Sequence, residues 1–405
     1  MRLKFAQISL MLVAVVLLAS CGSSQTSPKS KPIPNAFVVK GFSSGTIYAI
    51  SCFASGTCVT VGTSNIDSNG NSTPLIAIGV ASKNSWHSVH SPVSSGTFSG
   101  LTCYSKSYCI AVGTNIVDTT TNTGTSPTDL AIVAFSSNGG STWTVGNLPQ
   151  PNGISLVSVA CSSPTSHSAA SAGEICSAVG STGTTGDTFP ALFTTTDNGL
   201  TWKQDPIASN ISGYLNNITC ETGTQCHAIG NVESQGKTSG VITLASLDGG
   251  QSWTDQIYSS PNAPLLESIS CISASNCISG GYADQSTDSI GHVLGPPAVY
   301  NSKDDGKSWV SSKTFGSANG LISQVTCPHA NLSNCELVGG SGISKASVSL
   351  FANLSNGKWI QSPATYKNIV LYTIDCTLPD YCLAGGTQSS SINGMPEIVR
   401  IKNPY

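Results

Sequence analysis

The segment Ile47-Tyr48-Ala49-Ile50-Ser51-Cys52, separated by five residues from Cys58-Val59-Thr60-Val61-Gly62, determines the fold that the sequence predicts. Both halves are short and apolar, and the first alternates, as expected of two strands joined by a tight turn. Two cysteines that face each other across such a hairpin lie within the reach of a disulfide. We therefore expect a disulfide-linked β-hairpin at residues 47–62.

This hairpin pattern recurs seven times along the chain. The first cysteines of successive hairpins are 51, 58, 59, 51, 56 and 49 positions apart. An internal period near fifty residues is typical of β-propeller blades. The predicted disulfides are Cys52–Cys58, Cys103–Cys109, Cys161–Cys176, Cys220–Cys226, Cys271–Cys277, Cys327–Cys335 and Cys376–Cys382.

The cysteine content also indicates the compartment. The chain has 15 cysteines, of which only Cys21 lies outside the seven pairs. Fourteen paired cysteines predict an oxidising environment. A zinc ribbon would need cysteine pairs separated by two residues, and no pair has that spacing. No metal site and no cofactor are predicted.

The second half of each repeat carries an apolar strand, a tight turn and a tryptophan. Four of the turns have the same length, and shortened versions end at Trp86 and Trp359. The four are Ser136-Ser137-Asn138-Gly139-Gly140-Ser141-Thr142-Trp143, Thr195-Thr196-Asp197-Asn198-Gly199-Leu200-Thr201-Trp202, Ser246-Leu247-Asp248-Gly249-Gly250-Gln251-Ser252-Trp253 and Ser302-Lys303-Asp304-Asp305-Gly306-Lys307-Ser308-Trp309.

Three of these turns read Ser/Thr-x-Asp-x-Gly-x-x-Trp, and Asn138 replaces the aspartate in the fourth. The pattern resembles the Asp-box, or BNR, repeat of sialidase-like propellers, sortilin-type receptors, some glycanases and photosystem II assembly factors. The resemblance implies that the turn is structural and lies far from any active site. A carboxylate can accept N–H groups of its own turn, glycine supplies a positive φ, and tryptophan covers the hairpin. Calcium binding is disfavoured because each turn aligns a single carboxylate.

Ring closure follows from a count of strands. The seven cysteine hairpins are matched by only six tryptophan strands, and the last repeat ends after a third strand at Met395–Ile401. The strand Asn35–Gly41 precedes the first hairpin and can supply the missing fourth strand. We therefore expect one all-β domain at 35–405, a seven-bladed propeller of four-stranded blades whose last blade is closed by the N-terminal strand.

The N-terminus has the pattern of a signal peptide. Arg2 and Lys4 precede the apolar run Ile8–Leu18, which is short for a membrane span. The run ends in Leu18-Ala19-Ser20-Cys21, which resembles the lipobox of bacterial lipoproteins. That resemblance implies a signal peptide at 1–20, lipid on Cys21, and a Ser- and Pro-rich tether at 21–34 that holds the domain outside the cytoplasm at a membrane. The alternative is an ordinary signal peptide with a chance cysteine.

Charge is scarce. Charged residues make up 9% of the chain, against about 25% in ordinary soluble domains, and the net charge is −3. Nothing basic is concentrated enough to bind a phosphate backbone, which disfavours nucleic acid as a partner. Few charges also limit self-repulsion when carboxylates are protonated, so an acidic external medium is a hypothesis.

A propeller with these turns has two unlike faces. The disulfide turns and the tryptophan turns share one face, which we call the disulfide face. The variable loops between second and third strands, and the connections between blades, share the opposite face, which we call the loop face. Binding residues usually collect on such loops. The candidates are Asp67, Asp118, Asp129, Asp187, Glu233, Asp284, Asp288 and His292. The alternative is that they are solvated loop charges.

Several catalytic sites can be excluded by their residues. A sialidase needs three arginines to hold the substrate carboxylate, and beyond the signal peptide the chain has only Arg400. There is no Gly-x-Ser-x-Gly, His-Glu-x-x-His or phosphate-loop motif. The side chains that could stack on a sugar are Tyr48, Tyr104, Tyr108, Tyr214, Tyr282 and Tyr372, although packing is the competing role.

No catalytic residue is therefore predicted. The sequence favours a monomeric binding or assembly module that is anchored to a membrane and recognises a protein or a cell-surface glycan on its loop face. The alternative is a glycoside hydrolase or lyase of the Asp-box propeller type, which would need two carboxylates facing each other across the loop-face funnel.

Overall fold

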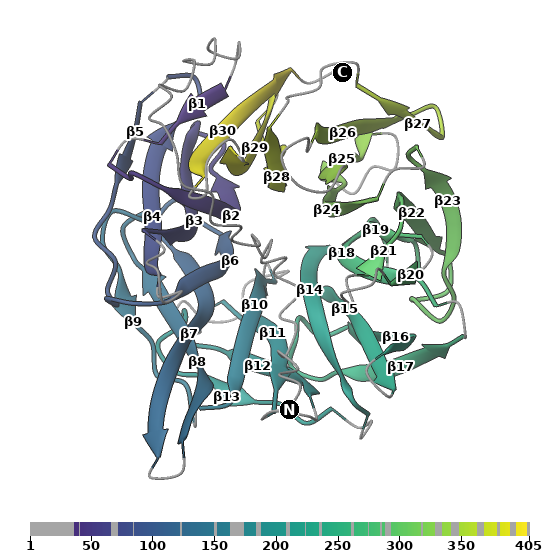
Figure 1. The fold of residues 1–405 in the computed structure, drawn as a ribbon, viewed down its shortest axis with the longest axis horizontal. Helices are drawn as coiled ribbons and strands as arrows, with labels where there is room; N and C mark the ends of the chain where they lie inside the picture. The colour runs from purple at the N-terminus through teal and green to yellow at the C-terminus, as the bar shows by residue number, and fades with distance from the viewer. Residues whose placement is uncertain are drawn as a thin grey trace, which may run out of the picture.

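The structure is a computed structural model. It describes residues 36–39 and 41–402, except 66–71, 84, 122–123, 150–151, 163–173, 184–187, 208–210, 223, 235–236, 261–262, 274, 284–285, 288–292, 317–318, 329–333, 342–347, 363–367, 379–380 and 389–393. Seven four-stranded antiparallel sheets are arranged as the blades of a ring (Figure 1). The predicted all-β, seven-bladed propeller is confirmed.

Blades 1 to 6 are meanders whose first strand is innermost (Figure 1). Blade 1 comprises β2 (Gly45–Cys52), β3 (Thr57–Ser64), β4 (Thr73–Val80) and β5 (Ser85–Ser88). Blade 2 comprises β6 (Thr97–Cys103), β7 (Cys109–Thr121), β8 (Gly124–Ser136) and β9 (Thr144–Val145). Blade 3 comprises β10 (Ile154–Cys161), β11 (Cys176–Thr182), β12 (Phe189–Thr195) and β13 (Lys203–Gln204).

The remaining blades follow in chain order. Blade 4 comprises β14 (Gly213–Thr222), β15 (Gln225–Ser234), β16 (Lys237–Ser246) and β17 (Thr254–Ser259). Blade 5 comprises β18 (Leu265–Cys271), β19 (Cys277–Tyr282), β22 (Pro297–Ser302) and β23 (Val310–Thr314), with a small hairpin of β20 (Ser286–Thr287) and β21 (Val293–Leu294) between its second and third strands. Blade 6 comprises β24 (Gly320–Thr326), β25 (Glu336–Ser341), β26 (Val348–Ser355) and β27 (Lys358–Gln361).

Blade 7 joins the two ends of the chain. It comprises β28 (Ile369–Asp375), β29 (Tyr381–Gln388), β30 (Met395–Lys402) and the N-terminal β1 (Ala36–Val38). The outermost strand β1 pairs antiparallel with β30, with Phe37 opposite Ile398. The predicted closure of the last blade by the N-terminal strand is therefore confirmed.

All seven predicted disulfides are present, one in each blade. Their Cα–Cα distances are 4.0–4.2 Å, as expected of residues that face each other on paired antiparallel strands. Cys52 and Cys58, for example, are direct partners in the register of β2 and β3. The bridges therefore lock the innermost hairpin of every blade.

Every innermost strand contains a β-bulge at the same height in the ring. The bulged residues are Tyr48, Ser99, Val157, Asn216, Glu267, Ser323 and Tyr372. A glycine of the second strand lies beside each bulge; the set is Gly62, Gly113, Gly180, Gly230, Gly281, Gly339 and Gly386. A Cβ atom on any of these glycines would lie 1.9–2.0 Å from a carbonyl oxygen of the first strand. This contact explains the glycine that recurs in the sequence after the second cysteine of each pair.

The core consists of apolar layers between neighbouring blades. One layer joins Ile110 of blade 2 to Leu156 and Phe193 of blade 3, and all three side chains are fully buried. Trp202 belongs to the same layer, and it is 5% exposed. The tryptophans predicted to cover the hairpins thus seal the outer ends of these layers.

Side chains of one blade also form hydrogen bonds with the backbone at the innermost strand of the next blade. At every junction at least one backbone N–H group donates to a side-chain oxygen of the preceding blade. The donor and acceptor pairs are Cys103 to Ser51, Leu156 to Thr114, Ile218 to Ser158, Ile269 to Asn217, Val325 to Ser268, Cys327 to Ser270, Ile374 to Gln324, Ile50 to Thr373 and Cys52 to Asp375. The distances are 2.6–3.3 Å. The last two bonds close the ring between blades 7 and 1.

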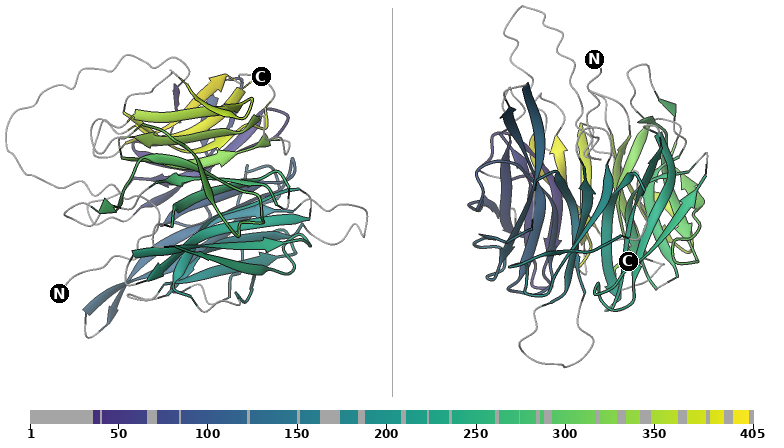
Figure 2. Two further views of the ribbon diagram at one scale, coloured as in Figure 1. Left: turned by 90° about the vertical axis from the view of Figure 1, so that its right-hand side faces the viewer. Right: turned by 90° about the horizontal axis from the view of Figure 1, so that it is seen from below.

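The ring has a projecting hairpin on its loop face. Figure 2 shows β7 and β8 rising on the same side of the ring as the short β20–β21 hairpin. Among the described residues, no helix is long and apolar enough to cross a membrane.

The bulge contact predicts unequal effects for two adjacent glycines of β25. Gly339→Ala places a Cβ 2.0 Å from the Leu321 carbonyl oxygen, whereas the atom nearest to a Cβ at Gly340 is Val370 Cγ1, at 3.4 Å. We expect Gly339→Ala to lower the free energy of unfolding by roughly 3 kcal/mol and Gly340→Ala to change it by less than about 1 kcal/mol. Denaturant melts of the two variants measure this, and equal effects would contradict the bulge as the cause.

Candidate functional site

Most loop-face candidates lie outside the described residues. These are Asp67, Asp187, Asp284, Asp288 and His292. Asp118 has a described backbone, in β7 opposite Pro127. Glu233 and Asp129 are half-buried, at the loop-face end of β15 and in β8. The structure thus places Glu233, Asp129 and the Asp118 backbone towards the predicted face, and it does not bring a described pair of them together.

The projecting β7–β8 hairpin is the largest described feature of the loop face. Its strands have 13 residues each, whereas the second strands of the other blades have 6 to 10. The innermost strand β6 pairs with β7 only as far as Thr114. The β7–β8 pairing continues to Thr121 opposite Gly124, so the hairpin extends seven residue pairs beyond that point. It is a two-stranded ribbon carried by a rigid blade.

The bulges turn one residue of each blade out of the inner layer. Six of the seven bulged residues are half-buried, and Asn216 is 9% exposed. Tyr48 and Tyr372 come from adjoining blades and meet edge to face, with ring centroids 5.4 Å apart. Burial raises the pKa of both hydroxyls, that of Tyr372 to about 12, so both tyrosines are neutral donors.

Asn216 and Glu267 lie on the other side of the ring, in blades 4 and 5 (Figure 1). The Asn216 amide donates to the Leu266 carbonyl oxygen at 2.8 Å. Burial raises the pKa of Tyr282, and the nearby Glu267 and Tyr214 raise it further. Four of the six predicted tyrosines therefore lie at or next to the bulges, in two separate pairs. Tyr48 and Tyr372 pack edge to face between blades 1 and 7. Tyr214 and Tyr282 lie near Glu267 in blades 4 and 5.

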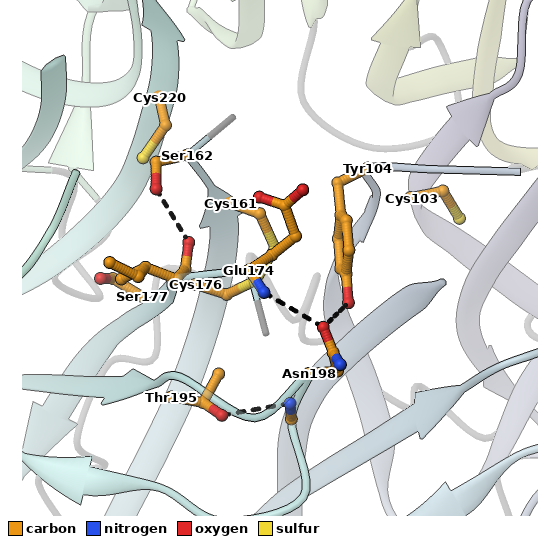
Figure 3. Close-up of a disulfide and its surroundings, with 12 residues drawn as sticks. Cys103, Tyr104, Cys161, Ser162, Glu174, Cys176, Ser177, Thr195, Asn198 and Cys220 are labelled. Carbon is orange, nitrogen blue, oxygen red and sulfur yellow. Dashed lines mark hydrogen bonds between the residues drawn. A yellow bond between two sulfur atoms is a disulfide. The ribbon is translucent and has the colours of Figure 1, made fainter. Parts of the chain in front are cut away.

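The other two predicted tyrosines lie on the disulfide face. Tyr104 and Tyr108 both belong to the Cys103–Cys109 loop. Their ring planes are parallel within 4°, and their ring centroids are 5.9 Å apart. The Tyr104 hydroxyl donates to Asn198 Oδ1 at 2.9 Å, and the Glu174 N–H donates to the same oxygen at 3.2 Å (Figure 3). Burial raises the pKa of the Glu174 carboxyl.

One cluster of metal-binding residue types occurs among the described residues. Ligand atoms of His227, Cys271 and Cys277 lie within 4.8 Å of one another, and all three residues are buried. Cys271 and Cys277 form a disulfide, so neither sulfur is a thiolate. In this oxidised form the cluster offers a cation at most one imidazole.

The three turns at 195–202, 246–253 and 302–309, which we call the aspartate turns, have nearly identical hydrogen bonds. In the second, Asp248 accepts the Ser252 N–H at 2.9 Å, the Ser252 hydroxyl at 2.6 Å and the Ser246 hydroxyl at 2.8 Å. Asn138 reproduces this pattern with an amide, which accepts the Thr142 N–H and donates to the Thr142 hydroxyl. These carboxylates are thus occupied by their own turns, which agrees with a structural role.

The described carboxyl groups fall into two classes. Partial burial alone would raise the pKa of Asp197, Asp248 and Asp304, but hydrogen bonds from the turn hydroxyls and N–H groups outweigh it and lower the pKa. Burial instead raises the pKa of Asp129, Glu174 and Asp375, and it raises that of Glu397 to about 7.

Three functional candidates were not identified from the sequence: Glu267, Glu174 and Asn198. Glu267 is a charged residue between Leu266 and Ile269 of an innermost strand, which is a recognisable signal in the sequence. Glu174 lies next to a disulfide in a loop of ordinary composition, and Asn198 has the sequence of a turn residue. No sequence pattern indicates that Glu174 and Asn198 lie close to Tyr104.

Comparison with known proteins gives the fold. No protein-family model matches the sequence, and no curated protein sequence is detectably similar to it. An ulvan lyase of polysaccharide lyase family 25 has a TM-score of 0.52 and 10% identity, over 91% of this chain and 93% of that chain. A GH74 xyloglucanase from Xanthomonas campestris has a TM-score of 0.53 and 12% identity, over 88% of this chain and 54% of that chain.

A structure of YCF48 bound to a D1 peptide is also similar, with a TM-score of 0.48 and 13% identity over 90% of this chain and 95% of that chain. At such identities these likenesses concern the fold alone.

The two classes of carboxyl predict a stability maximum at acid pH. Glu397 binds its proton more tightly in the folded state, so stability rises as the pH falls from 8 through about 7 to 5. The aspartate turns stabilise only while ionised, so their contribution is lost below about pH 4. We expect the melting temperature to be higher at pH 5 than at pH 8 and to fall below pH 4.

Thermal melts across this range test the prediction. Glu397→Gln should reduce the rise between pH 8 and pH 5, and Asp248→Asn should reduce the fall below pH 4. Maximum stability above pH 7 would contradict the assignment.

Proposed function

We propose that the chain is a lipid-anchored, extracytoplasmic binding or assembly module that recognises a protein or a cell-surface glycan on its loop face. The observation that carries this proposal is the β7–β8 hairpin, a long ribbon that rises from a disulfide-locked ring. A rigid ring that presents projecting segments is suited to recognition, because little order is lost when a partner binds. The seven disulfides indicate an oxidising environment, which agrees with an extracytoplasmic location.

The anchor rests on Cys21, which lies outside the described residues. We expect the full-length protein, expressed in a bacterium, to incorporate labelled palmitate and to sediment with membranes. Cys21→Ser should lose the label and become soluble, because no other residue of the tether can carry the thioether-linked lipid. Ser23→Ala, in the same tether, should keep both properties. Labelling of Cys21→Ser would exclude this anchor.

The hairpin provides the test of binding. In a variant in which Asn-Gly replaces residues 116–129, this two-residue turn links Asn115 to Leu130, its partner in the register. We expect capture of the partner, in a glycan array and a cell-surface pull-down, to fall by at least about tenfold relative to the parent protein. Lys303→Gln with Lys307→Gln, on the disulfide face, is the matched control. Full capture by the shortened variant would place recognition elsewhere.

A polysaccharide hydrolase or lyase is the second candidate. No two of the described loop-face carboxylates are brought together, and the group that favours this candidate is instead the single carboxylate of Glu267 near Tyr214 and Tyr282. A carboxylate and tyrosine hydroxyls are groups that can exchange protons with a sugar. The same binding experiment separates the two candidates. Release of shorter sugars that stops in Glu267→Gln means an enzyme, whereas capture without cleavage means a binding module.

A further inference from the structure

The disulfide face carries a second cluster of recognition groups, away from the loop face. It consists of Tyr104 and Tyr108 from blade 2 and of Glu174 and Asn198 from blade 3. Five of the seven disulfide loops have five residues between their cysteines. Among these five, the Cys103–Cys109 loop is the one that contains two aromatic residues. The two rings stack in parallel, and both side chains are half-buried. They form a small, fixed aromatic surface at the junction of the two blades.

Asn198 is held in one orientation. Its Oδ1 accepts both the Tyr104 hydroxyl and the Glu174 N–H, so the amide nitrogen must point away from these two donors. Among the described residues, none accepts a hydrogen bond from the Asn198 amide nitrogen. The group is thus a pair of oriented N–H donors beside the tyrosines.

Asn198 occupies a position of the turn at which the side chain is not needed for the turn itself. The equivalent residues of the turns in blades 2 and 4 are Gly139 and Gly249, and all three have a positive φ of 61–75°. Gly139 and Gly249 donate their N–H groups to the disulfide loop of their own blade, at 2.7 and 2.6 Å. Glycine therefore suffices for the turn, and the asparagine side chain adds the bridge to Tyr104.

Glu174 supplies an acceptor at the same place. The Cys161–Cys176 disulfide fixes the chain two residues beyond it, and Figure 3 shows its carboxyl group beside the Tyr104 ring. Its Oε2 atom is buried and has no hydrogen-bond partner among the described residues. A buried oxygen without a donor costs free energy, so this carboxyl group lies beside Tyr104 with part of its hydrogen-bonding capacity unused.

These groups fit one class of ligand. A pyranose has an apolar face of C–H groups, which packs on an aromatic ring, and a rim of hydroxyls, which both donate and accept hydrogen bonds. A cationic ligand fits less well because Lys106 lies exposed in the same loop and because burial favours the protonated form of Glu174. We propose that Tyr104, Tyr108, Glu174 and Asn198 form a binding site for a neutral sugar chain on the disulfide face.

Asn198→Gly tests the site with little risk to the fold, since glycine occupies the same position in two other blades. The full-length protein in a non-sugar detergent is titrated with cellohexaose, chitohexaose and xylohexaose. We expect at least one to bind, and we expect Asn198→Gly and Glu174→Gln each to weaken binding by about tenfold. Tyr108→Ala should abolish binding, and Tyr108→Phe should retain it because the stacking surface persists.

Two controls separate this site from the loop face. Asp305→Gly, at the equivalent position of blade 5, should bind as the parent does, and so should the variant with the shortened β7–β8 hairpin. Melting temperatures verify folding of every variant. The proposal would be overturned if the parent protein bound none of the three sugars. It would also be overturned if Asn198→Gly and Tyr108→Ala both bound a sugar as tightly as the parent does, whatever the loop face is found to bind.

Discussion

The structure depends on how the backbone N–H and C=O groups of the innermost strands find hydrogen-bond partners. Each of these strands pairs with the second strand of its own blade along one edge only, so N–H groups of the other edge need acceptors from elsewhere. Serine, threonine, asparagine, glutamine and aspartate side chains of the preceding blade provide them at all seven junctions. The apolar layers hold the blades together, and these directed bonds fix the height of one blade relative to the next.

This arrangement links the scarcity of charge to the abundance of hydroxyl groups. A hydroxyl between two blades can accept one N–H group and can also donate to a carbonyl. Ser279 and Thr60 make the second kind of bond, to carbonyl oxygens of their own blades. A charged side chain at such a place has to be desolvated, as Asp375 is, and burial there raises the pKa of its carboxyl. The low share of charged residues, 9% of the chain, thus follows in part from the packing between blades.

The sequence was sufficient for the blades, the disulfides and the closure, because each is a local pattern or a count. Cys52 and Cys58 are six positions apart, and Asp248 and Trp253 lie within one turn. The arrangement of the candidate groups was not predictable, since it depends on contacts between blades. Tyr48 and Tyr372 are distant in the chain and meet only because the ring closes. Nothing in the sequence around Asn198 distinguishes it from an ordinary turn residue, and its role appears only when Tyr104 of the previous blade is placed beside it.

The locality of the disulfides has a consequence for oxidation during export. Fourteen cysteines can be paired in more than about 100,000 ways. In five blades the correct partner is only six positions away, so the nearest available thiol is the native one, and short loops close fastest. A chain that emerges from its N-terminus can complete each bridge before the next pair of cysteines arrives. Correct pairing then needs no search among blades, and no isomerase has to undo a bond between distant parts of the ring.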